Sequence, residues 1–158
     1  MNYFCYDFDL VKLYIAEENG EIISVSSKDI INNEKIFSET KIIRTAKEQL
    51  SEYFSGNREK FDLPLKLNGT AFQNKVWREL LKIPYGETVS YRYIAEKVEN
   101  ANYSRAIGMA NNSNPIMIII PCHRVIGKGG ELTGYAGGIS LKKALLELEN
   151  NKNRLITN

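Results

Sequence analysis

Two adjacent residues of this chain carry side chains suited to nucleophilic chemistry. Cys122 is one of only two cysteines, and His123 is the only histidine. A thiol reacts as its thiolate, and a free thiol with a pKa near ~8.5 is only slightly ionised at neutral pH, so a neighbouring base would activate it. A carboxylate would orient the imidazole, and Glu149 is the candidate. These residues predict a cysteine nucleophile with histidine as its base.

The pair alone leaves other interpretations open. Consecutive side chains usually point apart, so Cys122 and His123 are expected to communicate through a water molecule. One alternative is a buried structural cysteine beside a surface histidine. Another is a cysteine hydrolase, although no glycine-rich nucleophile elbow surrounds Cys122. Cys5 is interpreted as structural, and two cysteines with one histidine are too few for a structural zinc site without carboxylates, so no metal is predicted.

Composition excludes several classes of protein. The chain has 158 residues, of which 43% are hydrophobic and 25% charged, as in globular proteins, so extensive disorder is excluded. The longest apolar run, residues 116–120, is far shorter than the roughly 20 residues of a membrane span. No basic segment precedes an apolar stretch at the start, so a signal peptide is not expected. A cytoplasmic location is predicted.

Charge is distributed unevenly, although the net charge is only +2. Residues 1–69 carry nine basic and twelve acidic side chains, and residues 70–149 carry ten basic and seven acidic ones. The second half is therefore mildly basic, which is compatible with a nucleic-acid partner.

The first segment has the pattern of strands followed by a helix. Asn19-Gly20 separates two apolar runs, which is a strong hairpin signal. Apolar residues recur at helical spacing over residues 42–54, and Gly56 suits the end of that helix. Residues 57–68, which include Pro64, are interpreted as a linker.

The second segment is a series of short helices. Thr70, Ser90 and Ser104 are predicted N-caps. The helices that begin at Ser90 and Ser104, with the polar turn between them, favour a helix-turn-helix, although two core helices of a small bundle would give the same pattern. A buried strand is predicted over residues 116–120, a glycine-rich loop over 127–138, and a last helix from Ser140.

A longer motif around Cys122 and His123 resembles that of a known protein family. Pro121-Cys122-His123-Arg124-Val125, with Asn114-Pro115 upstream and residues 133–138 (Thr-Gly-Tyr-Ala-Gly-Gly) downstream, resembles the methylated-DNA–protein-cysteine alkyltransferases, which repair O6-alkylguanine. The resemblance is detailed from Thr70 to Glu149. Residues 1–65 match only in general plan.

The resemblance implies a role for each matching residue at the reacting centre. Cys122 would accept the alkyl group, His123 would take the thiol proton through water, and Glu149 would orient His123. Asn114 would hold the turn that presents the cysteine. The remaining substrate-binding residues would be Tyr91, as a donor to guanine N3, the main chain of Val125 and of Cys122, Tyr135, and the backbone N–H of Ala136.

DNA contacts are implied in the same way. Arg105 would fill the gap left by the flipped nucleotide, and the small neighbours Ser104 and Ala106 would permit close approach in the minor groove. Some relatives carry serine in place of Ala136, but only a backbone donor is needed there. Some relatives bind zinc in the first segment, but this chain has no histidine before residue 123. Non-enzymatic relatives lack the cysteine.

The sequence therefore predicts an α/β protein of two parts. Residues 1–65 would form a small antiparallel sheet with a helix, of ribonuclease-H-like layout. Residues 66–150 would form a winged helix-turn-helix alkyltransferase domain, and 151–158 a polar tail. The predicted activity is a single, irreversible transfer from O6-alkylguanine in double-stranded DNA to Cys122, by a monomer without a cofactor. The alternative from another class is a winged-helix protein that binds DNA without accepting methyl groups.

Overall fold

A four-stranded sheet and one helix form the first unit of the structure, which contains residues 1–67 and 115–117. The strand order is β3-β2-β1-β4, and β2 pairs antiparallel with both β1 and β3. The predicted antiparallel sheet is thus present in β1, β2 and β3, and the two-residue β4 adds to it in parallel with β1. Since β4 lies at the opposite edge from β3, no hairpin turn dictates its direction. The strands are β1 (Asn2–Asp7), β2 (Lys12–Glu18), β3 (Glu21–Ser26) and β4 (Ile36–Phe37).

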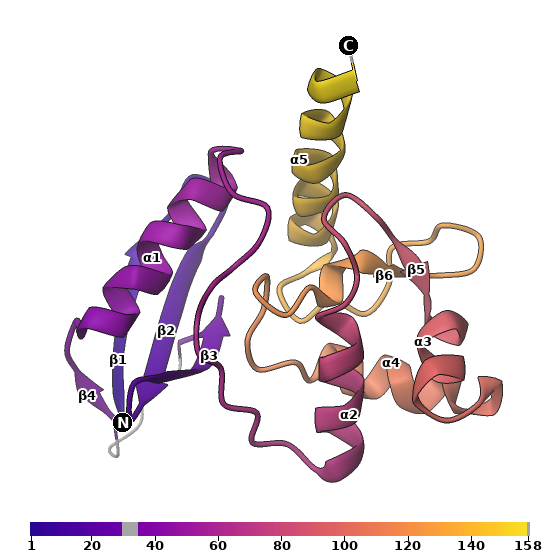
Figure 1. Cartoon of the computed structure of the whole chain (residues 1–158), viewed down its shortest axis with the longest axis horizontal. Coiled ribbons are helices and arrows are strands. Elements are labelled where there is room, and N and C mark those ends of the chain that lie inside the picture. Colours follow the sequence, from indigo (N-terminus) through magenta and orange to yellow (C-terminus); the bar gives the residue numbers. More distant parts are fainter. Residues whose placement is uncertain (30–34, 158) are drawn as a thin grey trace. The chain divides into compact units, whose positions relative to one another are not determined.

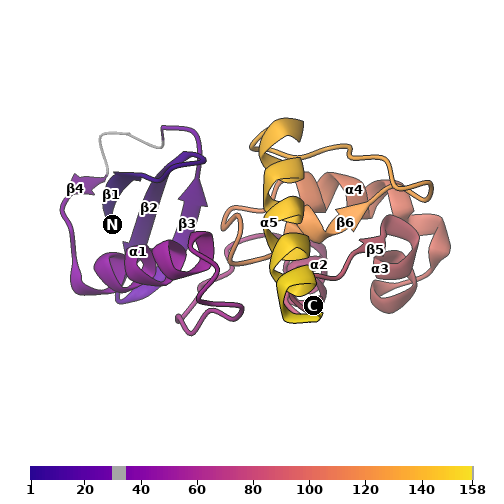
Figure 2. The same ribbon diagram turned by 90° about the horizontal axis from the view of Figure 1, so that it is seen from above.

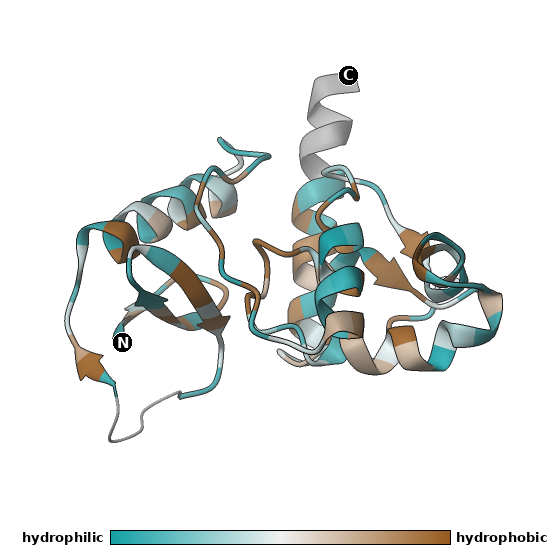
Figure 3. Cartoon of the chain, turned by 60° about the horizontal axis from the view of Figure 1, so that its bottom comes forward, coloured by the Kyte–Doolittle hydropathy of each residue, from teal (hydrophilic) through white to brown (hydrophobic). Residues whose placement is uncertain are grey.

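The predicted hairpin and helix of this unit are confirmed. Asn19 and Gly20 join β2 to β3 with φ angles of 53° and 83°, the positive values that a two-residue hairpin turn requires. Helix α1 (Lys41–Phe54) packs against the sheet. Figure 3 shows hydrophobic and hydrophilic residues alternating along α1, as expected of a helix with one face buried. The buried side chains of that face include Ile43, Ala46 and Leu50.

Short helices dominate the second unit, which contains residues 68–114 and 118–158. The structure is a computed structural model that describes residues 1–29 and 35–157, with residues 151–157 described by their backbone alone. Figures 1 and 2 show the elements of each unit in two perpendicular views. No helix within the described part of the chain is long and apolar enough to cross a membrane. The helices are α2 (Ala71–Leu80), α3 (Tyr91–Val98), α4 (Ser104–Asn112) and α5 (Ile139–Thr157).

Two of the three predicted helix caps are confirmed. Thr70 accepts from the backbone N–H of Gln73 in a reciprocal capping box, and Ser90 accepts from the N–H of Tyr93. Ser104 is not a cap, because it is already the first residue of α4 and its hydroxyl donates to the carbonyl of Ala101. The short 3₁₀ helix η1 (Ala101–Tyr103) precedes α4 and sets this arrangement.

The helix-turn-helix and the wing are present. Helices α3 and α4 pack together with η1 between them. Strand β5 (Val89–Ser90) pairs parallel with β6 (Val125–Ile126), and the glycine-rich loop follows β6. Figure 1 shows this loop returning to the start of α5.

One local prediction was wrong, and the C-terminal segment has a regular backbone that was not predicted. Residues 116–120 are buried but form no regular strand, because Ile118 adopts a φ of 73° and turns the chain. A β-branched residue rarely takes a positive φ, and the sequence pattern carries no sign of it. Helix α5 also continues to Thr157, so the backbone of the predicted polar tail is helical over residues 151–157.

Candidate active site

Cys122 begins a single 3₁₀ turn, η2 (Cys122–Arg124), that follows the apolar loop. Pro121 precedes the turn and removes one backbone donor, and the Cys122 N–H donates to the Ile120 carbonyl at 2.8 Å. Cys122 is only 2% exposed, and the next two residues of the turn are also buried. The candidate nucleophile therefore lies inside the second unit rather than on its surface.

The surroundings of Cys122 keep its thiol protonated at rest. Burial raises the pKa of the Cys122 thiol to about 11, while a hydrogen bond with the Asn114 side chain and the positive charge of Lys142 act in the opposite direction. A thiol with that pKa is almost wholly un-ionised near pH 7. Reaction through the thiolate therefore requires a base inside the site.

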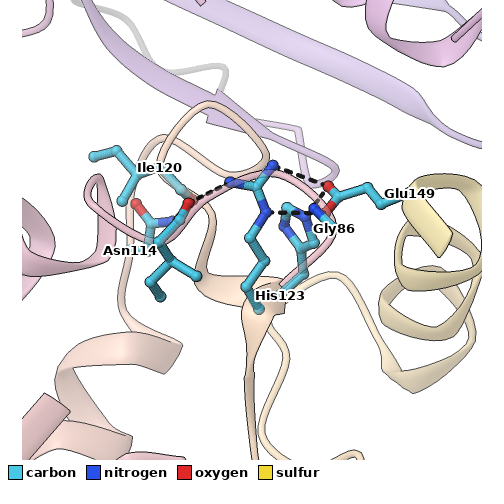
Figure 4. Close-up of polar contacts among 7 residues, drawn as sticks. Gly86, Asn114, Ile120, His123 and Glu149 are labelled. Carbon is cyan, nitrogen blue, oxygen red and sulfur yellow. Dashed lines mark hydrogen bonds and ion pairs between the residues drawn. The ribbon is translucent and has the colours of Figure 1, made fainter. Parts of the chain in front are cut away.

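His123 and Glu149 supply a buried base and its orienting carboxylate. The Nε2 atom of His123 lies 2.7 Å from Oε2 of Glu149, and the two side chains are 0% and 1% exposed. Figure 4 shows the imidazole ring and the carboxylate directed toward one another. Nδ1 of His123 is buried and has no hydrogen-bond partner among the residues that the structure describes.

Arg124 holds the same carboxylate from its other side. Its Nε donates to Oε1 of Glu149 at 2.9 Å, and its Nη2 donates to Oε2 at 3.1 Å. The backbone N–H of Gly86 is a second donor to Oε1, at 3.1 Å. Burial alone would raise the pKa of Glu149, but the hydrogen bonds from His123 and Arg124 and their charges lower it to about 2. Glu149 is therefore a carboxylate at neutral pH, and His123 donates to it from Nε2.

Asparagine side chains fix the backbone around the cysteine. Asn114 donates to the Ile120 carbonyl at 2.8 Å and so closes the loop that precedes the turn, as Figure 4 shows. Asn111 donates to the Cys122 carbonyl at 3.3 Å. Asn114 was predicted from the motif. Asn111 was not, since nothing in the spacing distinguishes it from the other asparagines near the end of α4.

A buried lysine was also missed by the sequence analysis. Lys142, on the first turns of α5, is 0% exposed and donates to the Val125 carbonyl at 2.6 Å and to the Thr133 carbonyl at 2.9 Å. Burial lowers the pKa of Lys142, and the proximity of Cys122 raises it. The only sequence feature that could have indicated its burial was its position next to Leu141, on the apolar face of the predicted last helix. The lysine connects the wing loop to the strand that follows the cysteine.

The predicted substrate-binding residues lie on three segments around this centre. Tyr91, at the start of α3, donates from its hydroxyl to the Thr133 carbonyl at 3.1 Å. Tyr135 is 7% exposed, and its hydroxyl has no hydrogen-bond partner in the described part of the chain. Burial raises the pKa of Tyr135, and the proximity of Cys122 and of the Glu149 carboxylate raises it further. Ala136 is exposed.

The carbonyls of Cys122 and Val125, predicted to accept from a guanine amino group, are already engaged. The first accepts from the Asn111 side chain and from the backbone N–H of Val125, and the second accepts from Lys142. A carbonyl has two lone pairs, so both acceptor positions of Cys122 are already used, and a guanine amino group would have to displace one of its two donors.

The predicted DNA contacts lie outside the buried centre. Arg105 is exposed on the first turn of α4, between the half-buried Ser104 and Ala106. Met109, one turn further on, is 71% exposed. The structure thus brings Asn114, Cys122, His123 and Glu149 into one buried cluster and leaves Arg105 on a surface helix.

In the described part of the chain, no three or more histidine, cysteine, aspartate or glutamate side chains are grouped so that they could hold a metal ion. The cluster can instead perform nucleophilic chemistry. It provides a buried thiol, an imidazole within the same turn, and an ionised carboxylate that fixes the proton of that imidazole on Nε2.

Family models match both parts of the chain. Residues 1–67 match the ribonuclease-like domain of 6-O-methylguanine DNA methyltransferase, and residues 71–151 match its DNA-binding domain.

Individual relatives agree with this assignment. The methylated-DNA–protein-cysteine methyltransferase of Methanosarcina barkeri is 53% identical over 126 residues, which cover 80% of this chain and 76% of the relative. The Mycobacterium tuberculosis protein of the same name is 56% identical over 68% of this chain and 65% of its own length. Among solved structures, Mycobacterium tuberculosis OGT in complex with DNA has a TM-score of 0.91 and 42% identity, covering 96% of this chain and 94% of that one.

Proposed function

Because this chain belongs to the 6-O-methylguanine DNA methyltransferase family, we propose that Cys122 accepts the alkyl group of an O6-alkylguanine in double-stranded DNA. The protein is a DNA-repair methyltransferase, and DNA is its partner. Each molecule acts once, because the thioether that forms has no easy route back to a thiol. The proposed reaction uses a monomer and no cofactor.

The buried His123–Glu149 pair beside Cys122 is the observation that carries this proposal. A thiol whose pKa is about 11 cannot react as it stands, so its proton must be taken up during the reaction. Nδ1 of His123 is the nitrogen that can accept this proton, since Nε2–H is bonded to Glu149. The proton passes through one water molecule, since adjacent side chains are poorly placed for direct transfer.

Transfer itself is an in-line displacement. The thiolate of Cys122 attacks the alkyl carbon, a bond forms between sulfur and that carbon, and the bond from carbon to O6 breaks. The guanine keeps the electron pair of the broken bond. Tyr91 donates a hydrogen bond to N3, and the backbone N–H of Ala136 donates near O6, so negative charge on the leaving base is stabilised as it develops.

Access to the thiol requires the nucleotide to leave the duplex. Cys122 is only 2% exposed, so a base stacked inside DNA cannot reach its sulfur. Flipping costs a few kcal/mol, and an exposed side chain that takes the place of the base offsets part of this cost. Arg105 has the exposure and the position on α4 for that role. The mild positive charge of residues 70–149 suits weak binding to the DNA backbone at any sequence.

Mass spectrometry of the intact protein tests the proposal. The protein is incubated with duplex DNA that contains one O6-methylguanine, and the modified peptide is then mapped. We expect the mass of one methyl group on Cys122, with saturation at one per chain. Cys122→Ala should gain no mass yet bind the same DNA, whereas Cys5→Ala should be methylated like the unmodified protein. Intact DNA binding with no mass change in the wild-type protein would instead indicate a lesion-binding protein without transfer.

A further inference from the structure

Arg124 is buried, and its guanidinium makes three hydrogen bonds within the site. It is 6% exposed, and its guanidinium donates to both oxygens of Glu149. Its third donor, Nη1, is bound to the Ile83 carbonyl at 2.8 Å, and the group lies 5.7 Å from the centre of the Tyr85 ring. The guanidinium is therefore held in one position by a carboxylate, a carbonyl and an aromatic ring.

This arrangement determines the charge that His123 can carry. A buried carboxylate whose one cationic neighbour is an imidazole favours the protonated imidazolium, because the two opposite charges then compensate each other. An imidazolium cannot accept the proton of a thiol. Arginine is permanently charged and already compensates Glu149 through two parallel hydrogen bonds, so the carboxylate needs no second positive charge.

We propose that Arg124 is a positioning residue for alkyl transfer, which by occupying both oxygens of Glu149 keeps the imidazole of His123 uncharged and thus able to accept the Cys122 proton. The proposal rests on the function proposed above, in which His123 is the base. Arg124 touches neither substrate nor sulfur in this scheme, and it acts only through Glu149.

The other charges around the imidazole act in the same direction or are already compensated. Burial lowers the pKa of His123, the Glu149 carboxylate raises it, and the positive charges of Arg124 and Lys142 lower it again. The Cys122 thiol is un-ionised at rest, and burial keeps the Tyr135 hydroxyl un-ionised. Among the described residues, the charged and titratable groups around the imidazole are Glu149 and Lys142 on α5, Arg124 and Cys122 on η2, Tyr135 in the wing loop, and the Tyr85 phenol against Arg124.

The chain allows a direct test, because His123 is its only histidine. Nitrogen-15 NMR of the resting protein, without DNA, reports the protonation and tautomer of that single ring as pH is varied. We expect a neutral ring with its proton on Nε2 at pH 7. A ring that carries both protons at pH 7 in the wild-type protein would overturn the proposal.

Two substitutions separate charge from structure. Arg124→Met should raise the pKa of His123, so the pH at which methyl transfer falls to half its plateau rate should rise by about one unit or more, with full recovery at higher pH. Arg124→Lys keeps the positive charge and should keep the ring neutral at pH 7. An unchanged histidine pKa in folded Arg124→Met would contradict the proposal. If Arg124→Met does not fold, the wild-type titration and Arg124→Lys still decide it, because a charged ring at pH 7 in either would count against it.

Arg58 offers a matched control in the first unit. It also donates to a glutamate, Glu52, and to a backbone carbonyl, that of Lys60. Arg58→Met should leave the pKa of His123 and the transfer rate unchanged. The NMR measurements use no DNA, so a protein that fails to accept methyl groups would refute the proposed function while leaving this inference to be judged on its own.

Discussion

The two units of this molecule bury very different side chains. In the described part of the first unit, the buried polar or charged residues are Glu17 and Gln49, and every other buried side chain is hydrophobic. The described part of the second unit buries six polar or charged residues, four of which are ionisable. These six are Asn111, Asn114, His123, Arg124, Lys142 and Glu149.

The partners of these groups differ as well. Glu17 accepts from the Asn2 side chain and from the backbone N–H of Gly20, which secures the hairpin beside it. Glu149 instead accepts from His123, from Arg124 and from Gly86, 63 residues earlier in the chain. Burying charges costs free energy that even a good ion pair barely recovers. The comparison suggests that the first unit uses its buried carboxylate for stability, whereas the second retains its buried charges for chemistry.

The sharpest test of this comparison replaces one buried glutamate in each unit. Glu149→Gln should slow methyl transfer by about a hundredfold or more, because the neutral amide no longer fixes the proton of His123 on Nε2. Glu17→Gln should leave the transfer rate within about twofold of the wild-type rate. Single-turnover transfer to duplex DNA is the measurement, with circular dichroism as the check on folding. Equal losses in both variants would show that the two carboxylates serve the same structural purpose.

Acid should affect the second unit through the same groups. Glu149 has a folded pKa of about 2 against an ordinary value of 4.5, so its contribution to stability is present above pH 4.5 and is lost as pH falls toward 2. That contribution is about 3 kcal/mol. The pKa of His123 in the folded protein lies below its ordinary value of 6.5, so below pH 6.5 the unfolded chain binds a proton more readily than the folded protein does. The free energy of unfolding therefore also decreases as pH drops below 6.5.

Urea unfolding at several pH values measures this effect. The wild-type protein should lose stability from pH 6.5 downward, with the Glu149 share lost below pH 4.5. Glu149→Gln lacks that carboxylate and should show a shallower loss of stability between pH 4.5 and 2.5 than the wild-type protein. Parallel curves for the wild-type protein and Glu149→Gln over that range would mean that the carboxylate is not held ionised by its buried partners.

Sequence reasoning succeeded where one short segment determines the outcome. The Asn19-Gly20 turn, the N-cap at Thr70 and the end of α1 just before Gly56 all depend on neighbouring residues, and each is present. It failed where conformation depends on distant packing. Residues 116–120 have the apolar composition of a strand, but the positive φ of Ile118 breaks the pattern. Ser104 has the residue type of a cap but begins α4, because the preceding turn is itself helical.

The candidate site shows the same division. The motif around Cys122 pointed to His123, Glu149 and Asn114, and the structure places all of them in one buried cluster. No periodicity reveals that Lys142 and Arg124 are buried, since both side chains are long and charged and are usually exposed. Their partners are backbone carbonyls and a carboxylate contributed by other segments, so the contacts exist only once the chain has folded.

A smaller effect should distinguish the buried cluster from the surface of the same unit. Arg105 is exposed on α4 and has no place in the cluster, so its loss should leave the thiol chemistry intact. Arg105→Ala should reduce transfer from duplex DNA by about tenfold, which corresponds to about 1.4 kcal/mol of lost assistance to flipping. Reaction with free O6-benzylguanine, which needs no flipping, should change little.

The ratio of the two rates is the quantity that carries the argument. Arg44→Ala, an exposed arginine of α1, provides the control and should leave both rates unchanged. If Arg105→Ala slowed both substrates equally, the arginine would act on the reacting centre rather than on the duplex. The distinction between a buried cluster that performs the chemistry and an exposed helix, α4, that contacts DNA would then be wrong. If only the duplex reaction slows, the buried charged cluster of the second unit supports the transfer step, and the exposed Arg105 on α4 assists the flipping of the base.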